Sequence, residues 1–348
     1  MTTDPLTDYS SDAETSFEEL GSSEAGRTHG LGPWHLAWRR LRRNRTALAF
    51  GLLFLALIAV ALLAPVYADH VANTTQNRQR IADTLNIGGK EVQVVSFDGV
   101  PTGPTWHSQY FIGADGNGRD VMVRLLYGAR NSLFIGIFAT LLTTFLAVVF
   151  GTLAGYFRGV TDAVVSRALD VLWAFPVLLL GVALGVALAT GGLHIGPISI
   201  ENNSLWIPTL IIGVVNTVYL ARPVRGQVLS LREREFVEAA RAQGAGALRI
   251  MFSELAPNLI TTVLVFFPIL LANAVLLEAA LSFLGAGVQP PNPSWGTMIS
   301  DGLRFIVSAP LLTIAPGLML VLTVLSLNIF GEGVRDAVDP RAQVRLEH

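Results

Sequence analysis

Long apolar segments separated by short polar ones dominate the chain from residue 46 onward. Six of these segments approach the ~20 apolar residues that a membrane-spanning helix needs. They cover residues 46–68, 132–156, 169–190, 205–221, 259–285 and 309–330. The fourth is short, and Pro268 predicts a break in the fifth. The pattern therefore predicts an all-α, multi-pass membrane protein with six transmembrane helices.

The same pattern divides the chain into segments. Residues 1–45 form an N-terminal tail, 46–68 the first helix, 69–131 a long polar insert, 132–331 the transmembrane core and 332–348 a C-terminal tail. Within the insert, Pro101 and Pro104 act as breakers, and the stretch from Glu91 to Phe97 predicts a strand. Within the core, residues 231–257 form the longest polar connection between helices. We expect the insert to be a small subdomain outside the membrane.

Basic residues are distributed unevenly between the two sides that six spans define. With the N-terminus inside, 17 of the 24 Lys and Arg residues fall in inner segments. Six of the other seven lie in the long insert, where the positive-inside rule has little force. The distribution predicts that both termini and the connection 231–257 face the cytoplasm.

The N-terminal tail changes sign along its length. Residues 1–30 carry seven acids and one arginine, whereas residues 31–45 carry five arginines and no acid. We expect the acidic part to be disordered. The basic part is suited to hold the first helix against anionic lipid headgroups.

Overall composition supports a membrane location and narrows the chemistry. The chain is 51% hydrophobic and only 14% charged, against roughly 25% charged in soluble domains. Its six histidines show no metal-ligand spacing, and no nucleophile stands beside a base, so we expect neither a metal site nor an enzyme active site. The sequence also lacks a phosphate-binding G-x-x-x-x-G-K-[ST] loop, and its one lysine, Lys90, is followed by Glu91. ATP would have to be bound by another chain.

The connection 231–257 has the pattern of two short helices joined by a turn. Ser230 and Glu233 fit the S-x-x-E capping box, which predicts a helix start. Gly244 is suited to the left-handed conformation that ends a helix, and Pro257 marks the start of the next apolar segment. The predicted second helix is amphipathic through Leu248, Met251 and Leu255.

The first of these helices is also predicted to be amphipathic. Phe236, Val237 and Ala240 fall on one face, and Arg234, Glu238 and Arg241 fall towards the other. The run Glu238-Ala239-Ala240 with Gly244 four residues later, closing at Pro257, resembles the signature loop of permease subunits in ATP-binding-cassette (ABC) importers. In that family the loop docks onto the ATPase. The resemblance thus assigns ATPase coupling to Phe236, Val237, Glu238, Ala239, Ala240, Arg241, Gly244 and Pro257.

Further segments resemble one branch of that family. Residues 111–120 (FIGADGNGRD), continuing to Arg130, are similar to a segment of the C-type subunit of dipeptide, oligopeptide and nickel permeases. Ala114 stands where threonine is usual. Residues 277–285, 293–296 and 333–341 resemble the same subunit in order. The resemblance covers about residues 35 to 341 and implies the type I ABC importer permease fold.

This resemblance implies a set of partners. They are a homologous B-type permease, two ATPase subunits or domains that bind ATP and Mg²⁺, and an extracytoplasmic binding protein, all at a bacterial cytoplasmic membrane. No cofactor or nucleic acid is expected on this chain. The implied cargo is a di- or oligopeptide, with nickel or another small solute as the alternative.

Three polar residues within the spans leave their roles open. Glu278 lies inside the fifth apolar segment, where an ionisable group is costly. It is either a pathway group or the partner of a neighbouring helix. Asn216 and Asn273 either line the pathway or bridge helices. An ion-coupled secondary transporter with Glu278 as proton carrier, and a membrane scaffold without flux, are the alternatives from other classes.

Overall fold

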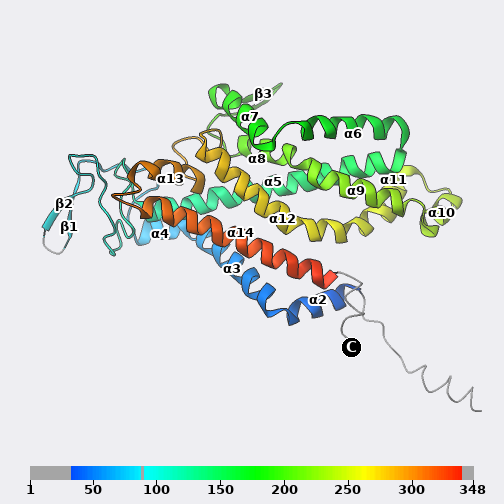
Figure 1. Ribbon diagram of the computed structural model, residues 1–348, viewed down its shortest axis with the longest axis horizontal. Helices are drawn as coiled ribbons and strands as arrows, with labels where there is room; N and C mark the ends of the chain where they lie inside the picture. The colour runs from blue at the N-terminus through cyan, green and yellow to red at the C-terminus, as the bar shows by residue number, and fades with distance from the viewer. Residues whose placement is uncertain (1–32, 88–89, 339–348) are drawn as a thin grey trace, which may run out of the picture.

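The computed structural model describes residues 33–87 and 90–338. The acidic tail, and the C-terminal residues from 339 onward, lie outside this range. Long helices run side by side along the molecule (Figure 1). Strands β1 and β2 lie at one end of this bundle, and α10 lies at the opposite end.

The elements follow in chain order. They are α2 (Pro33–Arg43), α3 (Arg45–Leu62), α4 (Ala64–His70), β1 (Thr84–Ile87), β2 (Lys90–Gln93), α5 (Val121–Phe157), α6 (Gly159–Ala174), α7 (Val177–Gly191), β3 (Leu193–Ile195) and β4 (Ile198–Ile200). They continue with α8 (Trp206–Val215), α9 (Thr217–Leu231), α10 (Glu235–Ala242), α11 (Ala247–Arg249), the π-helix η1 (Ile250–Leu255), α12 (Ala256–Phe283), α13 (Trp295–Gly302), the 3₁₀ turn η2 (Leu303–Phe305) and α14 (Leu311–Val338).

The helices lie where the spans were predicted, but not every predicted span is one continuous helix. In the described part of the chain, four helical runs are long and apolar enough to cross a membrane, namely α3, α5, the run Ala247–Phe283 and α14. Two bent pairs, α6 with α7 and α8 with α9, bring the number to six if each pair is one span. The expected all-helical, multi-pass architecture is therefore confirmed.

The third predicted span is not one helix. Residues 169–190 are interrupted between α6 and α7, whose axes differ by 87°. Phe175 is extended (φ −92°, ψ 135°) and Pro176 follows it. Proline disfavours the helical conformation of the residue before it, which explains the break. The fourth predicted span is bent more gently, by 40°, at Asn216.

The fifth predicted span is unbroken, contrary to the expectation for Pro268. Helix α12 continues through this proline. The proline ring lies against Gly331 of α14, where an added Cβ would come within 2.9 Å of the Pro268 Cβ. The absent side chain of Gly331 leaves room for the ring, so α14 packs against α12 at the proline.

Close helix contacts depend on small residues. A Cβ added at Gly151 of α5 would lie 2.8 Å from the carbonyl oxygen of Ala221, and one at Gly155 would lie 2.8 Å from Val228, both on α9. On α7, a Cβ at Gly185 would lie 2.1 Å from the carbonyl oxygen of Ala286. Gly151 and Gly155 therefore bring α5 and α9 into close contact, and Gly185 brings α7 against the backbone just after α12.

The insert after α3 is smaller than predicted. Strands β1 and β2 form an antiparallel hairpin, so the strand expected from Glu91 to Phe97 is confirmed only as far as Gln93. Helix α5 begins at Val121, capped by the Asp120 side chain, and takes up the last part of the range 69–131. The Asp120 carboxylate accepts hydrogen bonds from the amides of Val123 (3.1 Å) and Tyr110 (2.7 Å), which ties the insert to the helix start.

Candidate functional site

The predicted start of the first loop helix is wrong. Ser230 lies in the last turn of α9, which continues to Leu231, and α10 begins at Glu235 after an extended Arg234. Glu233, the other half of the expected capping box, instead forms an ion pair with Arg158. Packing of α9 along α5 carries the helix past the local start signal.

The predicted end of α10 at Gly244 is confirmed. This glycine has φ +81°, in the left-handed region. The Gly244 amide donates to the Arg241 carbonyl (2.9 Å), and the Ala245 amide donates to the Ala240 carbonyl (3.0 Å). Both bonds belong to the Schellman arrangement, which satisfies the last carbonyls of a helix. The turn between α10 and α11 therefore has a defined geometry.

The predicted coupling residues divide between the interior and the surface. Val237 is fully buried and packs in an apolar cluster with residues of α9, η1 and α12. Ala240 is half-buried at the edge of that cluster. Exposed positions are Phe236, Glu238, Ala239, Arg241 and Gly244. The expectation that Val237 docks outward is therefore corrected, because its side chain anchors α10 to its own chain.

Three contacts hold the segment before and along α10 against the end of α5. Arg232 donates from Nη1 to the carbonyl of Tyr156 at 2.6 Å. Arg241 lies over the Tyr156 ring, 5.7 Å from its centre. Arg158 pairs with Glu233. Partial burial, followed by the neighbouring charges of Arg158 and Arg241, lowers the pKa of Arg232. These contacts, none of which the sequence reasoning found, fix α10 to α5.

The second predicted loop helix is continuous with the fifth span. Helix α11, η1 and α12 form one run from Ala247 to Phe283. Met251 and Leu255 are buried as expected, but Leu248 is exposed. Pro257 lies in the first turn of α12 and is exposed. The π-helical stretch widens the helix next to the loop, and such stretches occur frequently at functional sites.

Glu278 is buried among hydroxyl side chains. It is fully buried on α12, and the Ser282 hydroxyl donates to its Oε1 at 2.7 Å. The hydroxyls of Ser132 on α5 and Ser294 before α13 are further polar neighbours. Its Oε2 has no hydrogen-bond partner among the described residues. The carboxyl therefore sits where α5, α12 and the approach to α13 meet, away from any exposed surface.

The two asparagines do not join Glu278 on one surface. Asn216 is 4% exposed and lies at the bend between α8 and α9. Asn273 is exposed on α12, on a different face from the buried Glu278. The three polar span residues thus occupy three different environments.

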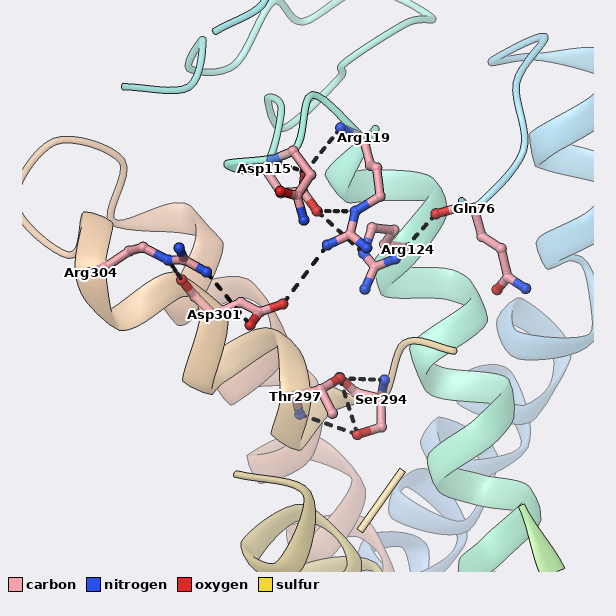
Figure 2. A network of polar contacts seen from close by, with 9 residues as sticks. Gln76, Asp115, Arg119, Arg124, Ser294, Thr297, Asp301 and Arg304 are labelled. Atoms are coloured by element: carbon pink, nitrogen blue, oxygen red, sulfur yellow. Dashed lines mark hydrogen bonds and ion pairs between the residues drawn. The ribbon is translucent and has the colours of Figure 1, made fainter. Parts of the chain in front are cut away.

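A second polar network involves α13, which lies towards the end of the bundle opposite α10 (Figure 1); Figure 2 shows the network from close by. Asp115 accepts from Arg119 Nε at 2.6 Å and lies 3.5 Å from Arg124 Nε. Arg119 also approaches Asp301 of α13 at 3.8 Å, and Arg124 donates to the carbonyl of Gln76 at 3.2 Å. The network connects the turn before α5 with α13 and with the chain after α4.

This network was missed, although part of its signal was present. Asp115, Arg119 and Arg124 all lie in the stretch of residues 111–130 that was singled out for its resemblance to the permease subunit. Arg124 is 4% exposed, which no local pattern indicates. A cavity of about 420 Å³ adjoins the network and is lined by amide and hydroxyl side chains, including Gln289, Asn292 and Thr297.

Comparison with known proteins agrees with this architecture. Residues 147–344 match the family described as binding-protein-dependent transport system inner membrane component. Residues 32–85 match the N-terminal transmembrane domain of oligopeptide transport permease C. Together the two matches include α2, α3, the broken spans, α10 and α12 to α14.

Relatives of known name align over nearly the whole chain. The glutathione transport system permease protein of Pectobacterium atrosepticum is 34% identical over 309 residues, which cover 89% of this chain and 91% of that protein. The dipeptide transport system permease protein of Alkalihalophilus pseudofirmus is 35% identical over 311 residues, with the same coverage. A solved chain of the inward-facing MetNI methionine ABC transporter aligns over 63% of this chain and 97% of its own length, at 21% identity and a TM-score of 0.48. The chain belongs to the family of binding-protein-dependent inner membrane transport components, in its branch of peptide-type ABC permease C subunits.

Proposed function

We propose that this chain forms half of the translocation pathway of an ATP-driven importer for di- or oligopeptides. The observation that carries the proposal is the identity of 34% and 35% to permeases named for glutathione and dipeptide transport, over 89% of the chain. Glutathione is itself a tripeptide. The match to the N-terminal domain of an oligopeptide permease points to the same class of cargo.

The proposed complex contains the partners implied by the family. A homologous B-type permease completes the pathway, two ATPase subunits or domains bind ATP and Mg²⁺, and an extracytoplasmic binding protein delivers the cargo. This chain is then a non-catalytic subunit in a bacterial inner membrane. The missing phosphate-binding loop in the sequence supports an ATPase on separate chains.

The proposed ATPase contact is the exposed face of α10. Phe236, Glu238, Ala239 and Arg241 are accessible there, and the small Ala239 permits close approach. Buried Val237 and the contacts of Arg232 hold the helix in place from behind. Gly244 orients the following run, which leads through Pro257 into α12. A displacement of α10 would therefore be transmitted into the transmembrane core.

The proposed orientation puts α10 and both termini in the cytoplasm. The basic helix α2 and α10 both lie away from β1 and β2 in the structure (Figure 1). The five arginines between residues 39 and 45 then lie on the same side of the membrane as the arginines around α10, as the positive-inside rule requires. The β1–β2 insert then faces outward, where it is available to a binding protein.

Uptake by the reconstituted complex tests the cargo and the energy source together. The full complex and its binding protein would be reconstituted in proteoliposomes whose lumen contains ATP and lies on the α10 side of the membrane. These proteoliposomes would be given labelled dipeptide, glutathione or Ni²⁺. We expect ATP-dependent uptake of a peptide that persists when a protonophore collapses the proton gradient. Uptake of Ni²⁺ alone would refute the peptide assignment, and uptake driven by the proton gradient without ATP would refute the ABC mechanism.

A further inference from the structure

A groove with apolar walls lies between α2, α12 and α14. Its volume is about 340 Å³. Helix α2 contributes Ala37, Trp38 and Leu41, α12 contributes Phe267, and α14 contributes Phe330 and Val334. Trp38 remains 55% exposed although it lines the groove, so the groove is open along one side. An open apolar groove beside the spans is a surface that hydrocarbon chains can fill.

Helix α2 carries positive charge beside this groove. Its groove-lining residues recur at the three- and four-residue spacing of one helix face, while Arg39, Arg42 and Arg43 are exposed on its other sides. The Arg42 guanidinium lies 5.8 Å from the centre of the Trp38 ring, at the rim of the groove. Arginine at such a position keeps its stem on apolar surface and its charge in the headgroup region.

Helix α14 also carries two acids in the stretch that lines the groove. Glu332 and Asp336 are exposed on α14, two and six residues after Phe330. That spacing puts them on the side of α14 opposite the groove-lining face of Phe330 and Val334. Between residues 31 and 45 the chain has five arginines and no acid. Among the described residues, the apolar groove is therefore edged by cations on α2, and the two acids of α14 nearest in sequence to its lining residues lie on the far side of that helix.

We propose that this groove is a binding site for one anionic phospholipid, with an acyl chain along the groove and the phosphate-bearing headgroup at Arg39, Arg42 and Arg43. The apolar groove requires an acyl chain, and the arginines require an anionic headgroup. A free phosphate would leave the groove empty, and a zwitterionic lipid would place its own cation beside the arginines. The exposed rings of Trp34 and Trp38 suit the headgroup level of a bilayer. Binding would hold α2 against α12 and α14.

Lipid titration followed by native mass spectrometry tests the site. The full-length chain, purified with its co-assembled subunits and stripped of lipid, would be titrated with dioleoyl phosphatidylglycerol, dioleoyl phosphatidylcholine and glycerol 3-phosphate. We expect phosphatidylglycerol to bind more tightly than phosphatidylcholine. The double variant Arg42→Gln with Arg43→Gln should weaken phosphatidylglycerol about 30-fold, the factor expected for two surface arginines, with no change for phosphatidylcholine.

A second variant tests the groove separately from the charge. Ala37→Trp should fill the groove and weaken both lipids, whereas Ala49→Trp, at an exposed position of α3, should weaken neither. Arg167→Gln with Arg249→Gln removes two exposed arginines away from α2 and should leave phosphatidylglycerol binding unchanged. Assembly of each variant would be checked by size exclusion.

Several results would overturn the proposal. They are full phosphatidylglycerol binding by Ala37→Trp, full binding by the double arginine variant, displacement of the lipid by equimolar glycerol 3-phosphate, or a second protein chain in the groove. The unaltered protein provides an independent measurement. A phosphatidylglycerol with a photoreactive acyl chain should crosslink to peptides of α2, α12 or α14 around the groove, and labelling confined to other helices would contradict the site.

Discussion

The Arg232 side chain donates a 2.6 Å hydrogen bond to the backbone carbonyl of Tyr156, 76 positions earlier in the chain. This carbonyl belongs to the last turn of α5, where helix carbonyls have no partner within the helix. One side chain thus donates to an otherwise unpaired carbonyl at the end of a long span, and it positions the turn before α10. The proposed coupling helix is therefore held by the span it would move.

Replacing Arg232 should separate ATP hydrolysis from uptake. Arg232→Gln shortens the side chain and removes the charge, so the Tyr156 carbonyl loses its donor and α10 loses a fixed position relative to α5. We expect the ATPase rate of the reconstituted complex to persist while peptide uptake per ATP falls severalfold. Arg167→Gln, which alters a highly exposed arginine on α6, is the matched control and should retain coupling. Unchanged uptake in Arg232→Gln would contradict the assigned role.

The conformation of Gly244 should matter more than its lack of a side chain. No atom lies within 4 Å of a Cβ built at this position, but its φ of +81° is strained for most residues. Gly244→Ala should therefore destabilise the turn by about 1 kcal/mol, whereas Gly244→Asn should cost less because asparagine tolerates the left-handed conformation. Gly244→Pro should uncouple hydrolysis from uptake.

Thermal melting and the ratio of uptake to hydrolysis would measure these effects. Gly246→Ala serves as the control, since that glycine also has open space around it but an ordinary φ of −70°. Equal melting temperatures and equal coupling for the alanine variants at 244 and 246 would show that the Gly244 conformation is not required.

Glu278 should behave as a structural group. Glu278→Gln keeps an acceptor for the Ser282 hydroxyl and keeps the volume of the side chain, so we expect normal assembly and ATP-driven uptake. Glu278→Ala leaves a cavity and an unpaired hydroxyl, and should destabilise the protein by about 2 kcal/mol or more. Melting curves and uptake assays distinguish the two variants. Loss of uptake in a well-assembled Glu278→Gln protein would instead support a proton carrier or pathway group.

Asp120 should give the insert a pH-dependent stability. Burial raises the pKa of its carboxyl above the usual value, against the lowering effect of the amides of Tyr110 and Val123. A raised folded-state pKa contributes stability that is fully present below the unfolded pKa and is lost as the pH rises through the folded one. The stability of the native protein relative to Asp120→Asn should therefore decrease as the pH rises from about 3.8 upward.

Thermal melts of both proteins across this pH range would measure the difference. Asp98→Asn, at an exposed carboxyl in the same insert, is the matched control substitution. A constant difference between the native protein and Asp120→Asn over the whole range would contradict the shift.

The features that the sequence predicted correctly are those that short-range interactions and segment length determine. Gly244 ends α10 because a left-handed residue is needed within a few bonds, and the apolar lengths of α3, α5, α12 and α14 follow from the thickness of a bilayer. The break at Pro176 also had a local signal. Hydrophobicity alone concealed it, because apolar residues stand on both sides of the proline.

Tertiary contacts decided the features that the sequence did not reveal. The capping box at Ser230 was overridden because α9 continues along α5, and Pro268 is accommodated because a glycine faces it from α14. The inward position of Val237 follows from packing against η1 and α9, which helix periodicity cannot distinguish from an outward docking face. The contact of Arg232 with Tyr156 joins segments that only the folded chain brings together.

The uninterrupted run from Ala247 to Phe283 makes the loop and the fifth span one mechanical part. Its 37 residues form a rod of about 55 Å, at 1.5 Å per residue. One end adjoins the turn after α10, and the other carries Glu278 and Ser282 next to the loop that precedes α13. Because the run stays helical through its π-helical stretch and Pro268, a twist of a few degrees applied at the α10 end would reach the Glu278 end as a rotation of the whole run. Under the proposed function, the ATPase contact and the far end of the fifth span would then have to move together.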